Sequence, residues 1–142
     1  MTAKEYLSQL RFRHARVNSL RERIARYRDL ATRCTPAYGG MPGGGGGNGS
    51  KTEEAVLKIA QLSAEMQERI DEIAELTVEI EAVIDAVPDV RYREILRMRH
   101  LNEWSWLRIA TELQLSEDWV KHAHGYALLQ VTVPEYAKKI VA

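Results

Sequence analysis

Glycine is concentrated in one short stretch of this 142-residue chain. Eight of the nine glycines lie between Gly39 and Gly49, and two of the four prolines, Pro36 and Pro42, lie in the same region. Because both residue types interrupt regular structure, segment 35–50 predicts a flexible loop. The residues on either side are almost free of glycine and favour long helices, so we expect an all-α fold.

The residues before this loop predict one helix from Thr2 to Arg33. Apolar or neutral side chains recur at steps of three and four, which is heptad spacing, with an interruption at Arg13. Leu7 and Leu30 widen the stripe. The stripe itself consists of Tyr6, Leu10, Val17, Leu20, Ile24, Tyr27 and Ala31. We therefore expect this helix to pack against a partner along one face.

The residues after the loop predict a second helix over about residues 51–87. Its heptad seam consists of Val56, Ile59, Ser63, Met66, Ile70, Ile73, Thr77, Ile80, Ile84 and Val87. Leu62, Leu76 and Val83 add a third apolar position, which is more than one partner helix covers. We expect residues 1–87 to form a long antiparallel hairpin, resembling a coiled coil. Its surplus apolar face predicts a homodimer or higher oligomer, such as a four-helix bundle of two hairpins.

The distribution of charge supports this pairing, although 20 basic and 20 acidic residues balance over the whole chain. Residues 1–33 carry nine basic and three acidic side chains, a net charge of +6. Residues 34–88 carry three basic and ten acidic ones, a net charge of −7. We therefore expect the arginines of the first helix to face the carboxylates of the second. The alternative is that these arginines form an arm for nucleic acid.

A helix-turn-helix is predicted over residues 88–130. Ser105 and Ser116 are typical N-cap residues, because a serine hydroxyl accepts a hydrogen bond from the free amides of the following turn. A turn at 114–116 joins two short helices, as this motif requires. The helices expected are 91–101, ended by Asn102-Glu103-Trp104, then Trp106 to Leu113, and Glu117 to Leu129.

The apolar residues of this segment suit the motif. Ala110 supplies the small side chain needed where two helices cross, and Leu115 is expected to fill the turn. The other expected core positions are Ile95, Leu96, Met98, Ile109, Leu113 and Val120. In a helix-turn-helix the second helix enters the major groove of DNA with its first turns. The tail, residues 131–142, is a separate segment after the third helix, and Pro134 suits the first turn of a short helix there.

One motif in this segment points to a family. It consists of Arg91, Tyr92, Trp106, Ile109, Ala110, Leu113, Leu115, Ser116, Trp119, Val120, His124, Gly125, Ala127 and Leu128. With it, residues 91–129 resemble region 4 of bacterial sigma factors. The whole chain is similar to phage and prophage late-transcription regulators, which have a basic helix, a loop matching Gly40-Met41-Pro42-Gly43, an acidic helix and a helix-turn-helix. The match in the loop indicates that the glycines are natural.

The resemblance implies sequence-specific binding of double-stranded DNA, control of transcription, and contact with the host RNA polymerase. The residues expected to contact DNA are Ser116, Glu117, Asp118, Trp119, Lys121 and His122, with Arg97, Arg99 and Arg108 for phosphates. The chain departs from its relatives in this helix, which usually carries arginines there. Here it offers Glu117, Asp118, Lys121, His122 and His124 instead.

The charge of the segment bears on how tightly it would bind. Residues 88–130 hold six basic and six acidic side chains. DNA affinity comes largely from phosphate neutralisation, so one copy is expected to bind weakly. Acidic side chains can still accept a hydrogen bond from cytosine. The alternative function is a helical protein-interaction module, a host-protein binder or inhibitor whose helix-turn-helix no longer reads DNA.

No pattern in the sequence indicates an enzyme, a cofactor or a metal site. Cys34 is the only cysteine, and His122 and His124 are two residues apart, so they face different sides of a helix. The glycine run lacks the Gly-Lys-Ser/Thr ending of a phosphate-binding loop. We expect neither a signal peptide nor a membrane span, and therefore a location in the cytoplasm of a bacterial host.

Overall fold

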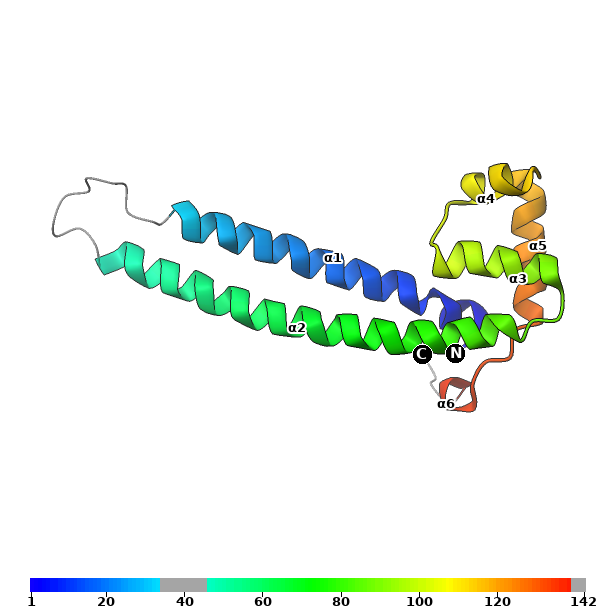
Figure 1. Ribbon diagram of the computed structural model, residues 1–142, viewed down its shortest axis with the longest axis horizontal. Helices are drawn as coiled ribbons and strands as arrows, with labels where there is room; N and C mark the ends of the chain where they lie inside the picture. The colour runs from blue at the N-terminus through cyan, green and yellow to red at the C-terminus, as the bar shows by residue number, and fades with distance from the viewer. Residues whose placement is uncertain (34–45, 139–142) are drawn as a thin grey trace. The chain divides into compact units, whose positions relative to one another are not determined.

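The computed structural model describes residues 1–33 and 46–138, and these residues form helices without a strand (Figure 1). The expected all-α fold is confirmed, with a long N-terminal helix packed on a second helix. The helices are α1 (Ala3–Arg33), α2 (Gly46–Asp85), α3 (Val90–Leu96), the π-helical turn η1 (Arg97–Leu101), α4 (Trp106–Leu113), α5 (Glu117–Leu129) and α6 (Glu135–Lys138). The predicted loop lies mostly outside the described residues, and its last five residues belong to α2.

The described chain divides into two compact units. One contains residues 14–72, and the other contains residues 1–13 and 73–142. This division differs from the boundary after residue 87 that the sequence suggested. The reason is that the first turns of α1 and the last turns of α2 share a core with Leu96 of α3 and Ala127 of α5.

The unit of residues 14–72 is a pair of antiparallel helix segments. Leu20, Ile24 and Leu62 form its buried core, with Tyr27, Ile59 and Met66 packed around it. An ion pair joins the two segments, because Arg16 Nη2 lies 2.7 Å from Glu65 Oε1. The hydrogen bond from Arg16 holds the pKa of Glu65 below its usual value. Among the described residues, this ion pair confirms at one position that an arginine of α1 pairs with a carboxylate of α2.

Most of the apolar stripe predicted for α1 is buried, but Tyr27 and Ala31 near its end are only half-buried, and Leu30 is 48% exposed. Part of the α2 seam is exposed as well. Val56 and Ile70, both assigned to the seam, are 54% and 37% exposed. Ala55 and Leu62 are buried instead, at 5% and 4% exposure. A straight α-helix repeats every 3.6 residues and drifts by about 20° per heptad from a seam drawn at 3.5, so a strict heptad pattern misassigns positions along a long helix. Val78 adds further exposed apolar surface.

The other unit has two cores. The first brings together Tyr6, Leu7 and Leu10 of α1, Ile80 and Ile84 of α2, and Leu96, Ala127, Val133 and Ala137. The second core belongs to the helix-turn-helix and is described with it below. The described part of the tail, residues 131–138, therefore contributes to the first core, since Val133 and Ala137 are buried there. Pro134 directly precedes α6, and its carbonyl accepts hydrogen bonds from Ala137 and Lys138.

A shared carboxylate fastens both chain-terminal regions to α2. Tyr6 Oη donates a 2.6 Å hydrogen bond to Glu79, and Tyr136 donates to the same carboxylate oxygen. Burial and the adjacent carboxylate raise the pKa of Tyr6, so the phenol stays protonated and remains a donor. Among the described residues, none of the helices is both long and apolar enough to cross a bilayer.

Candidate nucleic-acid interface

Helices α4 and α5 form the predicted helix-turn-helix. Both serine N-caps are confirmed: Ser105 Oγ accepts from the amide of Arg108 at 3.2 Å, and Ser116 Oγ accepts from that of Trp119 at 3.1 Å. Gln114 ends α4 in the left-handed conformation, with φ of 57°. This conformation reverses the chain within three residues, so α5 begins directly after the turn.

The core between the two helices is small and closely packed. Ile109 and Val120 are fully buried, and Ala110 is 3% exposed, as the crossing of two helices requires. Ile95 and Ala123 complete the cluster. These positions confirm the prediction from the apolar pattern.

One residue assigned to this core lies outside it. Leu115 was expected to fill the turn, but its side chain is 41% exposed. The backbone closes the turn instead, because the amide of Leu115 donates to the carbonyl of Ala110 at 2.9 Å. Because this backbone hydrogen bond closes the turn, the Leu115 side chain is not needed to fill it and faces solvent.

The first turns of α5 present a mixed and exposed surface. Ser116, Glu117, Asp118, Lys121 and His122 are all exposed. Lys121 Nζ lies 3.4 Å from Glu117 Oε1, so its charge is partly compensated within the helix. The side chain of His122 bonds back to the carbonyl of Asp118 at 2.7 Å. Trp119, on the same turns, is 39% exposed and is the largest side chain available there for contact.

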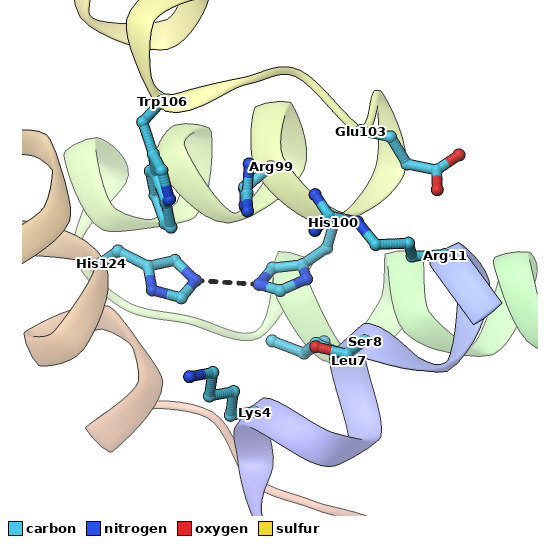
Figure 2. Close-up of a pocket in the computed structure, with 9 residues that line it drawn as sticks. All are labelled: Lys4, Leu7, Ser8, Arg11, Arg99, His100, Glu103, Trp106 and His124. Carbon is cyan, nitrogen blue, oxygen red and sulfur yellow. Dashed lines mark hydrogen bonds between the residues drawn. The ribbon is translucent and has the colours of Figure 1, made fainter. Parts of the chain in front are cut away.

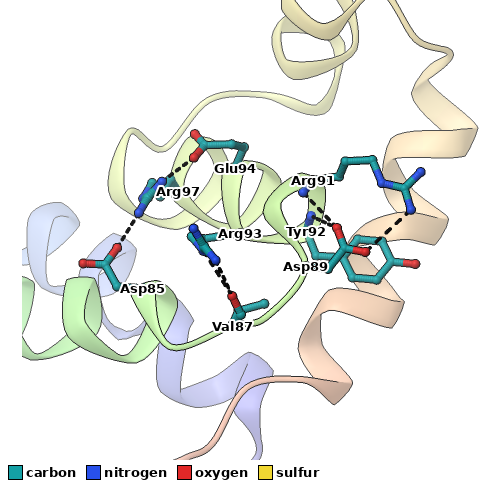
Figure 3. Close-up of polar contacts among 8 residues, drawn as sticks. All are labelled: Asp85, Val87, Asp89, Arg91, Tyr92, Arg93, Glu94 and Arg97. Atoms are coloured by element: carbon teal, nitrogen blue, oxygen red, sulfur yellow. Dashed lines mark hydrogen bonds and ion pairs between the residues drawn. The ribbon is translucent and has the colours of Figure 1, made fainter.

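Arg97, one of the expected phosphate contacts, is engaged elsewhere. Its guanidinium forms ion pairs with Asp85 at the end of α2 and with Glu94 of α3 (Figure 3). The hydrogen bond to Asp85, together with the charges of both carboxylates, raises the pKa of Arg97. Arg97 therefore joins α2 to α3 and has two carboxylates competing with any phosphate.

The same junction is held by two further contacts. Asp89 caps α3, accepting from the amides of Arg91 at 2.9 Å and Tyr92 at 3.4 Å. Arg93 donates twice to the carbonyl of Val87, at 3.1 and 3.0 Å (Figure 3). These bonds occupy backbone groups that the helix ends leave free, so α3 has a defined direction relative to the last turns of α2.

The other two arginines stack on tryptophans. Arg108 is exposed and lies over the ring of Trp104 at 4.1 Å, which leaves its outer N–H groups available to a phosphate. Arg99 lies over Trp106 at 4.1 Å and donates to the carbonyl of Trp104 at 2.9 Å. Burial, and then the charge of Arg11, lower the pKa of Arg99. Of the three arginines expected at DNA, Arg108 is exposed, whereas Arg97 and Arg99 are half-buried.

His124 is buried whereas His122 is exposed, so the two rings lie on different sides of α5, as their spacing predicted. His124 is 7% exposed, and its Nε2 lies 2.9 Å from Nε2 of His100, which is 8% exposed (Figure 2). The ring also packs edge-on against Trp106, with centroids 4.8 Å apart. Burial is the main cause that lowers the pKa of His100 to about 3 and that of His124 to about 4, so both rings are neutral at pH 7.

The pairing of these histidines depends on an irregularity that the sequence did not reveal. Residues 97–101 form a π-helical turn where a regular helix was expected, and Glu103 follows with φ of 56°. A π-turn holds more residues than an α-turn, so later side chains are displaced from α-helical register. The one sequence signal for the pair was that His100 and His124 lie in two segments expected to be neighbours.

Comparison with known proteins found no matching family model, no matching curated protein and no matching solved structure.

Proposed function

We propose that this chain binds double-stranded DNA through the first turns of α5 and regulates transcription, as its resemblance to phage late-transcription regulators implies. The observation that carries the proposal is the two-helix unit of α4 and α5, with both N-caps formed and the start of α5 exposed. In this motif the second helix lies in the major groove, and its initial residues reach base edges.

The charges of this surface define how it would bind. Arg108 and Lys121 are the exposed cations of α4 and α5, whereas Glu117 and Asp118 oppose phosphate approach. Each phosphate contact contributes about one unit to the dependence of log K on log salt. A single copy therefore binds weakly, and a homodimer, formed through the exposed apolar positions of the hairpin, would supply a second half-site in the bacterial cytoplasm.

The first test is selection of bound duplexes from a random library at about 0.1 M salt, followed by sequencing. Enrichment of two related half-sites supports a dimeric regulator. Absence of enrichment, with the protein folded by circular dichroism, refutes sequence-specific binding.

Three variants then test the surface itself. Lys121→Ala should weaken binding of the selected duplex and lower the salt slope by about one. Glu117→Gln should strengthen binding, because it removes a repulsive charge and releases Lys121. Lys51→Ala, an exposed lysine of α2, is the matched control and should leave affinity unchanged. Equal affinity in all three variants would exclude this face as the DNA contact.

Exposed apolar side chains favour a second candidate, a protein-binding module. Leu107 is 64% exposed, and Leu115 and Trp119 are 41% and 39% exposed, all within the helix-turn-helix. Apolar and aromatic side chains anchor protein interfaces. Two results together would favour this candidate over DNA binding. The wild-type protein would enrich no duplex but would capture RNA polymerase, and Trp119→Ala would abolish that capture.

A further inference from the structure

A cavity of about 180 Å³ lies beside the buried histidine pair, between the first turns of α1 and the helix-turn-helix. Lys4 and Arg11 reach it from α1, Arg99 from η1, and His100 and His124 line it as a pair (Figure 2). All of these residues belong to the same compact unit. Taking about 30 Å³ for a water molecule, the volume corresponds to about six waters, so the cavity accommodates a small ligand.

The cavity collects positive charge. Three cationic side chains, Lys4, Arg11 and Arg99, line it together with a single carboxylate, that of Glu103, which leaves an excess of two positive charges. The cations are close enough to disfavour one another: Arg11 lowers the pKa of Arg99, and Lys4 contributes to lowering that of His124. Like charges held together in a partly buried site are stabilised by a bound anion.

The histidine pair sets the character of the inner wall. Their 2.9 Å contact consumes one N–H and one lone pair, and both rings are neutral at pH 7. All positive charge therefore comes from the lysine and the arginines. Arg99 is also fixed in place, since it is stacked on Trp106 and bonded to the Trp104 carbonyl. A guanidinium has five N–H donors, so most of those of Arg99 remain for a ligand.

We propose that this cavity binds a small dianion, a phosphate monoester or a short dicarboxylate, held by Lys4, Arg11 and Arg99. The excess of two charges sets the charge of the ligand, and the volume sets its size. Arginine pairs bidentately with both phosphate and carboxylate, so the two ligand classes share one chemistry. This binding does not depend on the proposed DNA interaction, because the cavity is lined by residues other than those of the first turns of α5.

The test uses the full chain, isothermal titration calorimetry at pH 7.5, and inorganic phosphate, succinate and acetate as probes. Trp106 lines the cavity, so its fluorescence provides a second readout. We expect saturable binding of phosphate or succinate with one site per chain, and at least tenfold weaker binding of the monoanion acetate. Saturation by only one of the two dianions supports the proposal and identifies the ligand class.

Two charge-removing variants locate the site. Arg11→Gln should weaken dianion binding about tenfold, the effect of losing one charge-assisted hydrogen bond. Arg26→Gln changes the same charge on the same helix at an exposed position outside the cavity and should alter binding less than twofold. Equal weakening by both variants, or no saturable binding of either dianion, overturns the proposal.

A duplex of random sequence separates a small ligand from the DNA backbone as the source of the anion. Under the proposal, Arg11→Gln leaves duplex affinity in fluorescence anisotropy unchanged while weakening phosphate or succinate binding. The reverse result, lost duplex affinity without any binding of small dianions, assigns the cations to the phosphodiester backbone and overturns the proposal. Failure to bind any duplex refutes the proposed function alone, because calorimetry contains no DNA.

Discussion

The histidine pair makes stability depend on pH in a defined direction. In the unfolded chain each ring titrates near pH 6.5, whereas the folded pKa values are about 3 for His100 and about 4 for His124. Burial is the main cause, and the cations Lys4, Arg11 and Arg99 add to it. Between the folded pKa values and pH 6.5, the unfolded chain binds more protons at these two histidines than the folded chain does. Stability is therefore complete above pH 6.5 and falls as the pH drops toward 4.

The magnitude follows from the same values. At pH 5 the unfolded rings are about 1.5 pH units below their pKa while both folded rings are still neutral, which costs about 2 kcal/mol for each histidine. The pair together lowers the free energy of unfolding by about 4 kcal/mol between pH 7.5 and pH 5. That is a large fraction of the 5–15 kcal/mol typical of a folded domain.

The assay is urea denaturation followed by circular dichroism at 222 nm, at pH 7.5 and pH 5. A double variant, His100→Gln with His124→Gln, keeps hydrogen-bonding groups but cannot titrate, so it should lose about 4 kcal/mol less than the wild type over this interval. His122→Gln changes an exposed histidine of the same helix and should behave as the wild type. An identical pH dependence in the double variant and the wild type would refute the argument.

Three further predictions concern the helix-turn-helix and are measured by urea denaturation at pH 7.5. Ser116→Ala should lower the free energy of unfolding by about 1 kcal/mol, because the amide of Trp119 loses its capping acceptor. Ala110→Leu should lower it by about 1–3 kcal/mol, since the larger side chain overpacks the helix crossing. Gly125→Ala should raise it by about 0.5–1 kcal/mol, because an added Cβ on this α5 residue meets no atom within 4 Å.

Each of these has an outcome that contradicts it. A Ser116→Thr variant, which keeps the hydroxyl, as damaging as Ser116→Ala would show that loss of the hydroxyl is not the cause. Unchanged stability in Ala110→Leu would mean that the two helices do not cross at this residue. A destabilising Gly125→Ala would indicate a neighbour at that position.

Local chemistry was enough to predict the elements. Near-absence of glycine, heptad spacing and serine caps identified α1, α2, α4 and α5, with α4 and α5 predicted to the residue. Helix formation, capping and amphipathic spacing depend on residues within a few positions of one another, so a single sequence contains that information. The candidate contacts Glu117, Asp118, Lys121 and His122 were likewise predicted as exposed and are exposed.

What the sequence could not determine depended on residues distant along the chain. Burial of His124 requires His100 as its partner, and His100 reaches it from an unexpected π-helical turn. The cavity gathers Lys4 and Arg11 from one end of the chain beside Arg99, and Arg97 finds Asp85 across a helix junction. Periodicity reports which face of a helix is apolar. Which charges then meet, and which rings leave water, is decided only when the packed helices bring remote side chains within a few ångströms.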